Sequence, residues 1–174
     1  MVIKVENLIQ KNIINFYLPR KITADNHVVI TTQEQQPDNP LCHAIWQISG
    51  ITQCLMAENL LAVKYDDANA YAEIKLLVLA EIDDYIAANG PIINSTNSLS
   101  TIATAEILAD SLIRPTLNRD GGDISFVSFN DGIITIQFTG HCAGCPYAQN
   151  TLNNVVTKTL RHYIPEINQV QVKE

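Results

Sequence analysis

The sequence is short of three features, and each shortage excludes a class of protein. No apolar run reaches the length of about 18 residues that a membrane-spanning helix needs, so no membrane partner is expected. Lys and Arg number 11 against 18 Asp and Glu, which gives a net charge of -7 and leaves no basic cluster for nucleic acid. Residues 1–6 have neither a secretory-signal layout nor the Arg-rich character of a transit peptide, and the sequence therefore predicts a cytoplasmic protein.

Cysteine is also scarce, with four residues at Cys42, Cys54, Cys142 and Cys145. Four are too few for the disulfide scaffold of a secreted protein of 174 residues. Cys42 and Cys54 each lie in an apolar run, and we expect both to be ordinary buried cysteines. Cys142 and Cys145 form the one close pair, a CxxC motif, which in a cytoplasmic protein indicates metal, cluster or redox chemistry.

A polar segment of small residues, Asn94 to Thr101, divides the chain, and it follows the helix-terminating triplet Asn89-Gly90-Pro91. Helix and strand patterns occur on both sides, so the sequence predicts an α+β protein of two small domains. The predicted domains span residues 1–92 and 104–174, with a linker at 93–103. Before residue 95 there are six Lys and Arg and eleven Asp and Glu, so most of the net negative charge belongs to the N-terminal half.

The N-terminal half combines strand patterns with two helices. Asn39 before Pro40 is a typical helix start, an Asn cap followed by proline in the first turn. Apolar residues recur at spacings of three and four between Ile74 and Ile86, which indicates an amphipathic helix. We expect strands at Val2–Val5, Ile13–Leu18, Ile51–Met56 and Asn59–Lys64, and solvated positions for Asp66-Asp67 and Asp83-Asp84.

The C-terminal half predicts the order α-β-β-α-β. Its first helix should begin at Ser100 or Thr104 and end or kink at Pro115. Asp131-Gly132 separates two β-rich runs, 124–129 and 133–139, and indicates a hairpin because both residues tolerate positive φ. The CxxC motif then lies between the second strand and the second helix, and a last strand is expected at Ile167–Val172.

The position of the CxxC motif favours thiolate chemistry. A thiol at a helix N-terminus lies near the positive end of the helix dipole, so the pKa values of Cys142 and Cys145 should fall. The thiolate is the form that binds a metal or attacks a disulfide. The intervening Ala143 and Gly144 are small and leave room for both sulfur atoms to face one metal-containing group.

Two thiolates do not complete such a site, because zinc or an iron–sulfur cluster usually takes four protein ligands. His141 is a nearby alternative ligand, but its ring is expected to point away, as a surface imidazole. A symmetric dimer would supply four thiolates from two copies of Cys142 and Cys145. A cluster shared in this way would be exposed and held by few contacts, which suits transfer.

Two other uses of the CxxC motif stay open. A thiol–disulfide oxidoreductase would cycle the two thiols, and a zinc-binding interaction module would use them as structural ligands. Ala-Gly between the cysteines, and a hairpin rather than a βαβ unit before them, argue against the oxidoreductase. The sequence has no nucleophile–base triad, phosphate-binding loop or dinucleotide fingerprint, so we do not expect an enzyme.

Several separated motifs resemble the NifU C-terminal domain in order and spacing. They are Ile113-Arg114-Pro115, Arg119-Asp120-Gly121-Gly122-Asp123-Ile124, Gly140-His141-Cys142-Ala143-Gly144-Cys145-Pro146 and Ile164-Pro165-Glu166-Ile167. The N-terminal half is similar to the small domain that precedes it in two-domain Nfu-type proteins, through Asn39-Pro40-Leu41 and Ile48-Ser49-Gly50-Ile51.

The resemblance implies an iron–sulfur cluster carrier. Nfu-type proteins accept a [4Fe-4S] cluster from an upstream scaffold, bridge it between two protomers and pass it to apo iron–sulfur proteins. On this basis Cys142 and Cys145 would be the cluster ligands, with zinc as an alternative occupant. Gly121 and Gly122 would shape the turn beside the site, and the chain departs from the family at His141 and Tyr147, where small residues are common.

Overall fold

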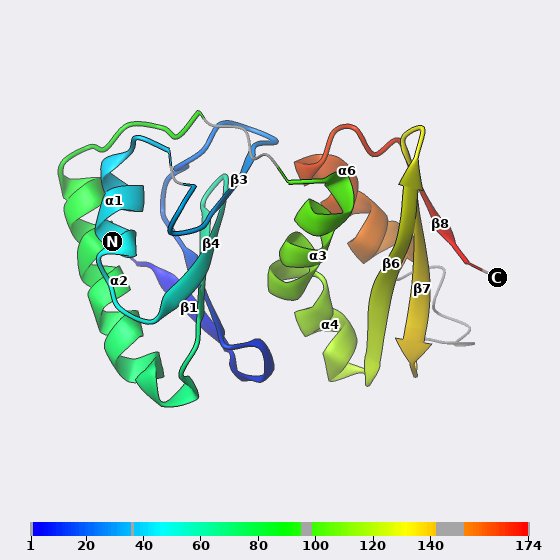
Figure 1. The fold of residues 1–174 in the computed structure, drawn as a ribbon, viewed down its shortest axis with the longest axis horizontal. Helices are drawn as coiled ribbons and strands as arrows, with labels where there is room; N and C mark the ends of the chain where they lie inside the picture. Colours follow the sequence, from blue (N-terminus) through cyan, green and yellow to red (C-terminus); the bar gives the residue numbers. More distant parts are fainter. Residues whose placement is uncertain (1, 36, 95–98, 142–151, 174) are drawn as a thin grey trace. The chain divides into compact units, whose positions relative to one another are not determined.

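The structure, a computed structural model, describes residues 2–35, 37–94, 99–141 and 152–173. It divides into two compact units, Met1–Asn97 and Ser98–Glu174 (Figure 1). Each unit combines helices with a sheet, which confirms the predicted α+β class with two domains. In the described part of the chain, no helix has the length and apolar character needed to cross a membrane.

The first unit is an antiparallel sheet of five strands with two helices against one face (Figure 1). The strand order is β1-β2-β5-β4-β3. The strands are β1 (Lys4–Leu8), β2 (Ile13–Tyr17), β3 (Val28–Thr31), β4 (Ile51–Ala57) and β5 (Leu60–Tyr65). The helices are α1 (Pro40–Trp46) and α2 (Tyr71–Ala87), and the short 3₁₀ turns are η1 (Ile9–Lys11) and η2 (Ala68–Ala70).

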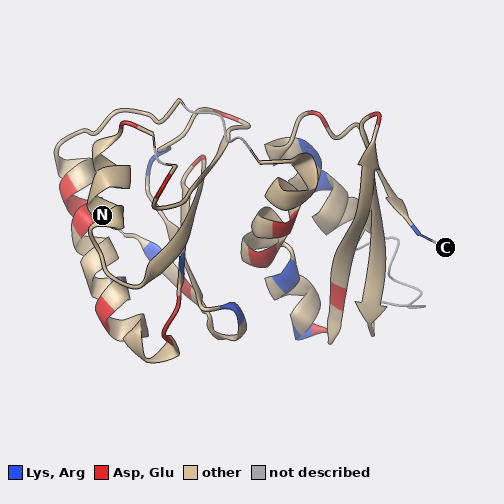
Figure 2. Cartoon of the chain, viewed as in Figure 1, with Lys and Arg blue, Asp and Glu red and all other residues tan. Residues whose placement is uncertain are grey.

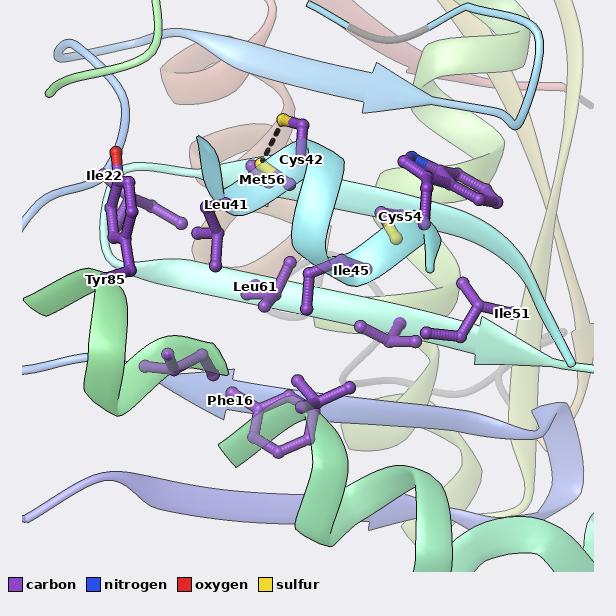
Figure 3. Packing of buried hydrophobic residues seen from close by; sticks show 14 of the residues in the cluster. Phe16, Ile22, Leu41, Cys42, Ile45, Ile51, Cys54, Met56, Leu61 and Tyr85 are labelled. Carbon is purple, nitrogen blue, oxygen red and sulfur yellow. Dashed lines mark hydrogen bonds between the residues drawn. The ribbon is translucent and has the colours of Figure 1, made fainter. Parts of the chain in front are cut away.

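The core of the first unit lies between the sheet and its helices (Figure 3). Alternate residues of the central strands face this core, because side chains alternate between the two faces of a strand. Phe16 of β2 pairs with Leu61 of β5, and Leu61 pairs with Met56 of β4, and all three are fully buried. Helix α1 packs Leu41 and Ile45 onto them.

Helix α2 is the predicted amphipathic helix. It buries Ile74, Val78, Ile82 and Tyr85, which confirms the spacing of the apolar stripe. Leu77 belongs to the same sequence pattern, yet the structure leaves it 43% exposed. The buried stripe is therefore narrower than the apolar pattern.

Helix α1 begins at the predicted cap. The Asn39 side-chain oxygen accepts hydrogen bonds from the Leu41 and Cys42 amides at 2.9 and 3.4 Å, and Pro40 occupies the first turn. The Asn39 Nδ2 atom donates to the Tyr85 hydroxyl at 3.3 Å. Asn39 therefore joins the start of α1 to the end of α2.

Replacing Asn39 with Ala should lower the free energy of unfolding by about 1–2 kcal/mol, because the helix cap and a buried hydrogen bond are lost together. Urea unfolding followed by circular dichroism measures the change. Gln47→Ala, at the exposed far end of α1, is the control and should shift the free energy by about 0.5 kcal/mol or less. Equal values for the two variants would contradict a structural role for the cap.

Strand β3 was not predicted from the sequence, and the first strand lies later in the chain than predicted. The four residues of β3 are all buried at one edge of the sheet, where Thr31 pairs with Cys54 of β4. A run of four residues buried throughout has no polar–apolar alternation from which to recognise a strand. The first strand lies at Lys4–Leu8 rather than Val2–Val5, because its pairing with β2 sets its position.

The second unit is a sheet of three strands in the order β6-β7-β8, with helices on one face (Figure 1). Strands β6 and β7 are antiparallel, and β8 runs parallel to β7. The elements are α3 (Thr101–Leu112), α4 (Arg114–Arg119), β6 (Gly122–Asn130), β7 (Ile133–Gly140), the π-helical segment η3 (Leu152–Thr157), α6 (Lys158–Tyr163) and β8 (Gln169–Val172). Their order confirms the predicted succession, with the first helix broken in two just before Pro115.

The β6–β7 hairpin has the predicted turn. Asp131 and Gly132 both adopt positive φ, 49° and 80°, between the paired residues Asn130 and Ile133. This is the two-residue geometry whose twist matches that of the flanking strands. In β7 the alternating Ile134, Ile136 and Phe138 are buried, which confirms that one face of the strand packs on the core.

Candidate functional site

The predicted ligands Cys142 and Cys145 lie outside the described residues, as does Tyr147. The structure describes both flanks of the segment that carries them. Before the segment, β7 ends at Gly140 and His141 follows; after it, the chain continues in η3 from Leu152. These flanks fix where the chain enters and leaves the CxxC segment.

The entry flank is held by a close backbone contact between two glycines. Gly140 has φ +62°, and a Cβ atom on it would lie only 2.4 Å from the carbonyl oxygen of Gly121. The same oxygen accepts a hydrogen bond from the His141 amide at 3.0 Å. Gly121 has φ +71°, and its amide donates a hydrogen bond to the Asn118 carbonyl at 3.1 Å. The residues just before Cys142 are therefore anchored to the turn between α4 and β6, at the Gly121-Gly122 pair expected to shape this region.

The His141 side chain is exposed and lies against Gly121. Its Nδ1 atom would be 2.7 Å from a Cβ atom on Gly121. A side chain at position 121 would therefore displace the imidazole as well as strain the backbone. Whether His141 contributes a ligand stays an open prediction, since the segment that follows it lies outside the described residues.

Replacing Gly140 with Ala should destabilise the second unit by about 2 kcal/mol, because the new methyl group meets a backbone oxygen and the residue keeps positive φ. Thermal unfolding measures this, and Thr139→Ala at the exposed neighbouring position should change little by comparison. The anchoring is refuted if the Gly140 and Thr139 variants unfold at the same temperature.

Arg114 connects the same turn to helix α3. Its guanidinium donates to the Glu106 carboxylate at 2.6 Å, to Asp110 at 2.8 Å and to Asp123 at 3.0 Å. It also donates to the backbone carbonyls of Glu106 and Ile124 at 3.3 and 3.0 Å. The side chain is only 8% exposed. Burial alone would lower the pKa of Arg114, but its hydrogen bond to Glu106 and the charges of Asp110 and Glu106 outweigh burial and raise it.

No role for Arg114 was predicted from the sequence, where it belongs to the motif Ile113-Arg114-Pro115. One signal was available: an arginine beside Pro115 with acidic residues four and eight positions before it, at Asp110 and Glu106. The contact with Asp123 crosses from helix α4 to strand β6 and has no local sequence signature.

The exit flank is anchored by apolar packing. Leu152, Val156 and Leu160 recur every fourth residue through η3 and α6, and all three are buried. These three residues therefore form one buried apolar face. The chain is thus packed on the second unit as soon as it leaves the CxxC segment.

The other two cysteines are buried in the first unit, as predicted. Both have no exposed surface, and the Cys42 Sγ atom lies 3.8 Å from the Met56 Sδ atom (Figure 3). Burial raises the pKa of Cys42 to about 12. Burial and the neighbouring Cys42 raise the pKa of Cys54 further, against a hydrogen bond with Thr31 that lowers it. Both thiols therefore stay protonated near neutral pH, and their burial keeps them out of reach of a metal ion from solvent.

Within the described ranges, no group of three or more His, Cys, Asp or Glu side chains is placed to hold a metal ion. The Asp66-Asp67 and Asp83-Asp84 pairs are exposed, as predicted. The described residues thus offer no metal centre that would compete with the CxxC motif.

Comparison with known proteins agrees with the C-terminal motifs. Residues 106–171 match the family model of the NifU-like domain. Over 143 residues the chain is 29% identical to proteins named "NFU1 iron-sulfur cluster scaffold homolog, mitochondrial" from Drosophila willistoni, Drosophila persimilis and Drosophila grimshawi. These matches cover 76% of this chain and 50%, 51% and 48% of the three relatives, so the chain spans about half the length of the curated relatives it matches.

The relatives contradict the expected cytoplasmic location, because all three are named as mitochondrial proteins. That expectation depended on the character of residues 1–6. In a chain that spans about half of its relatives, these residues are no guide to the compartment. The matched domain and the relatives agree with each other on the family: the chain contains a NifU-like domain and is a homologue of the NifU/Nfu-type iron–sulfur cluster scaffold proteins.

Proposed function

We propose that this protein is an iron–sulfur cluster carrier without enzymatic activity of its own. The observation that carries the proposal is the NifU-like match at residues 106–171, which includes both Cys142 and Cys145. The relatives are named as scaffolds rather than as enzymes, which favours a role in holding and passing on a cluster. The proposed substrate is a [4Fe-4S] cluster, received from an upstream scaffold and delivered to apo iron–sulfur proteins.

The ligand count supports a cluster shared between two copies. Cys42 and Cys54 are buried protonated thiols in the first unit and do not fit as ligands. Cys142 and Cys145 then leave each chain with two cysteine ligands where a cluster takes four. A two-fold dimer completes the set with the same two residues of the second copy.

Transfer would proceed by ligand exchange. Thiolates of a recipient protein would replace Cys142 and Cys145 one at a time, which requires that the cluster be reachable from solvent. The role of the surrounding fold is to hold the cysteine segment at its two ends. The Gly121–Gly140 contact and the Arg114 hydrogen bonds fix its entry, and Leu152 and Val156 fix its exit.

Anaerobic reconstitution with iron and sulfide tests the proposal. The full chain should take up about four irons and four sulfides per two chains and elute from a sizing column as a dimer. A chain that binds only zinc would be an interaction module, and one that binds no metal but cycles a disulfide would be an oxidoreductase. Either result would refute the proposed carrier function.

The domain limits 1–92 and 104–174 remain predictions that limited proteolysis can examine.

A further inference from the structure

A groove lies on the first unit, lined by residues of its two helices and of the segments that flank them. It has a volume of about 610 Å³ and runs between the C-terminal end of α1 and the first three turns of α2, from Glu73 to Glu81. Its apolar lining includes Ala44 and Ile48 at the α1 side and Leu77 at the α2 side. Leu77 is 43% exposed. It belongs to the apolar sequence pattern of α2 but not to the stripe that the helix buries.

Carboxylates surround this apolar lining. Asp66 and Asp67 precede α2, Glu73 and Glu81 lie on it, and no Lys or Arg lines the groove. Figure 2 shows acidic residues along α2. Within the described part of the chain, the side chains of Asp66, Glu73 and Glu81 have no ion pair or hydrogen bond with another residue. The groove therefore combines exposed apolar surface with carboxylates whose negative charge is not compensated by a neighbouring cation among the described residues.

Local helix stability explains only part of this charge. The Asp67 side chain accepts the Asn69 amide at 2.9 Å, and Glu73 lies in the first turn of α2, where a negative charge complements the helix dipole. Glu81 lies two turns further along, where the dipole gives it no such role. The exposure of Leu77 between Glu73 and Glu81 is not explained by helix stability either.

The spacing on α2 fits a helical partner. Glu73, Leu77 and Glu81 are four residues apart and form one row, and the two carboxylates stand about 12 Å apart along the axis at 1.5 Å per residue. A second helix with basic residues eight positions apart and an aliphatic residue midway would match this row in both charge and apolarity. Packing of a helix into a groove between two others is a common mode of peptide recognition.

We propose that this groove binds a basic amphipathic helix of a partner protein, with the partner's Lys or Arg residues at the carboxylates and an aliphatic side chain against Leu77. The charge complementarity selects against acidic segments and predicts binding that weakens as salt rises. The proposal concerns the first unit alone and does not depend on cluster binding.

The test uses the full chain without cluster, labelled with ¹⁵N, and a synthetic 18-residue amphipathic peptide made only of Leu and Lys. Amide shifts are followed as the peptide is added at low and at physiological salt, and a peptide with Glu in place of Lys is the control ligand. The Leu/Lys peptide should shift amides around Leu77 and Ile48, and the Leu/Glu peptide should not.

Two matched double variants separate this site from general acidity. Glu73→Gln with Glu81→Gln removes two groove charges, and Asp83→Asn with Asp84→Asn removes two exposed charges from the same helix outside the groove. The groove variant should bind the peptide about tenfold more weakly, and the control variant should bind as the parent does. Leu77→Ser should also weaken binding without changing the charge.

Equal weakening in the two double variants would overturn the proposal, because attraction to the overall charge of -7 would then suffice. Shifts confined to other parts of the chain, or no shifts at all, would overturn it too. Failure of the chain to load a cluster would leave this result unaffected, so the two proposals can fail separately.

Discussion

Replacing Cys142 with Ser is expected to abolish cluster loading. After anaerobic reconstitution, the iron and sulfide content should fall from about four of each per two chains to the background of a chain without ligands. In a dimer the substitution removes one ligand from each copy, so two of the four thiolates are lost at once. A serine hydroxyl stays protonated near neutral pH and does not replace a thiolate as a soft ligand. Cys145→Ser should have the same effect.

Cys42→Ala and Cys54→Ala are the matched controls, because they remove the other two thiols of the chain. Their loading should equal that of the parent, with circular dichroism to verify that the first unit is folded. Full loading of Cys142→Ser would refute the ligand assignment. Loss of the cluster in a folded Cys54→Ala variant would refute sharing between two copies, because it would make a buried cysteine a ligand.

The features that sequence predicted well depend on neighbouring residues. The cap at Asn39 and the turn at Asp131-Gly132 each require only a few residues in a particular order, and the structure has both where the sequence placed them. The CxxC motif is local in the same sense and lies within the residues that match the NifU-like domain, but its role as a ligand pair stays a prediction.

The features that sequence missed depend on residues that are distant along the chain. Strand β3 is defined by pairing with β4, more than twenty residues later, and its four buried residues show no alternation of their own. The exposure of Leu77 follows from how α1 and α2 pack, which periodicity within α2 cannot reveal. The Gly121–Gly140 contact exists because β6 pairs with β7 from Gly122 and Gly140 onward.

Replacing Arg114 with Ala should destabilise the second unit by about 3 kcal/mol. Removal of one partner from a buried ionic network leaves the others without compensation, which is among the most damaging single changes. Glu106 and Asp123 are 39% and 43% exposed and can regain water, whereas Asp110, at 19%, and the Ile124 carbonyl have less access to it. Arg114→Lys keeps the charge but cannot reproduce the branched set of hydrogen bonds, and should recover only part of the loss.

The effect should be confined to the second unit, and hydrogen exchange of the full chain measures it there. Protection of the β6 and β7 amides should fall, while that of β4 and β5 in the first unit stays unchanged. Arg161→Ala, at an exposed position on α6, is the control for loss of an arginine and should leave both sheets protected. Unchanged protection of β6 in the Arg114→Ala variant would contradict its structural role.

Arg114 also connects stability to the cluster site, although it is not a ligand. It bonds Asp123 and the Ile124 carbonyl, which directly follow the Gly121-Gly122 turn that anchors the entry to the cysteine segment. Loosening this turn should lower cluster retention in Arg114→Ala even though Cys142 and Cys145 are unchanged. In Arg114→Lys, cluster retention should recover in proportion to the recovered protection of β6. If Arg114 has no influence on the site, Arg114→Ala and Arg114→Lys should retain the cluster equally well.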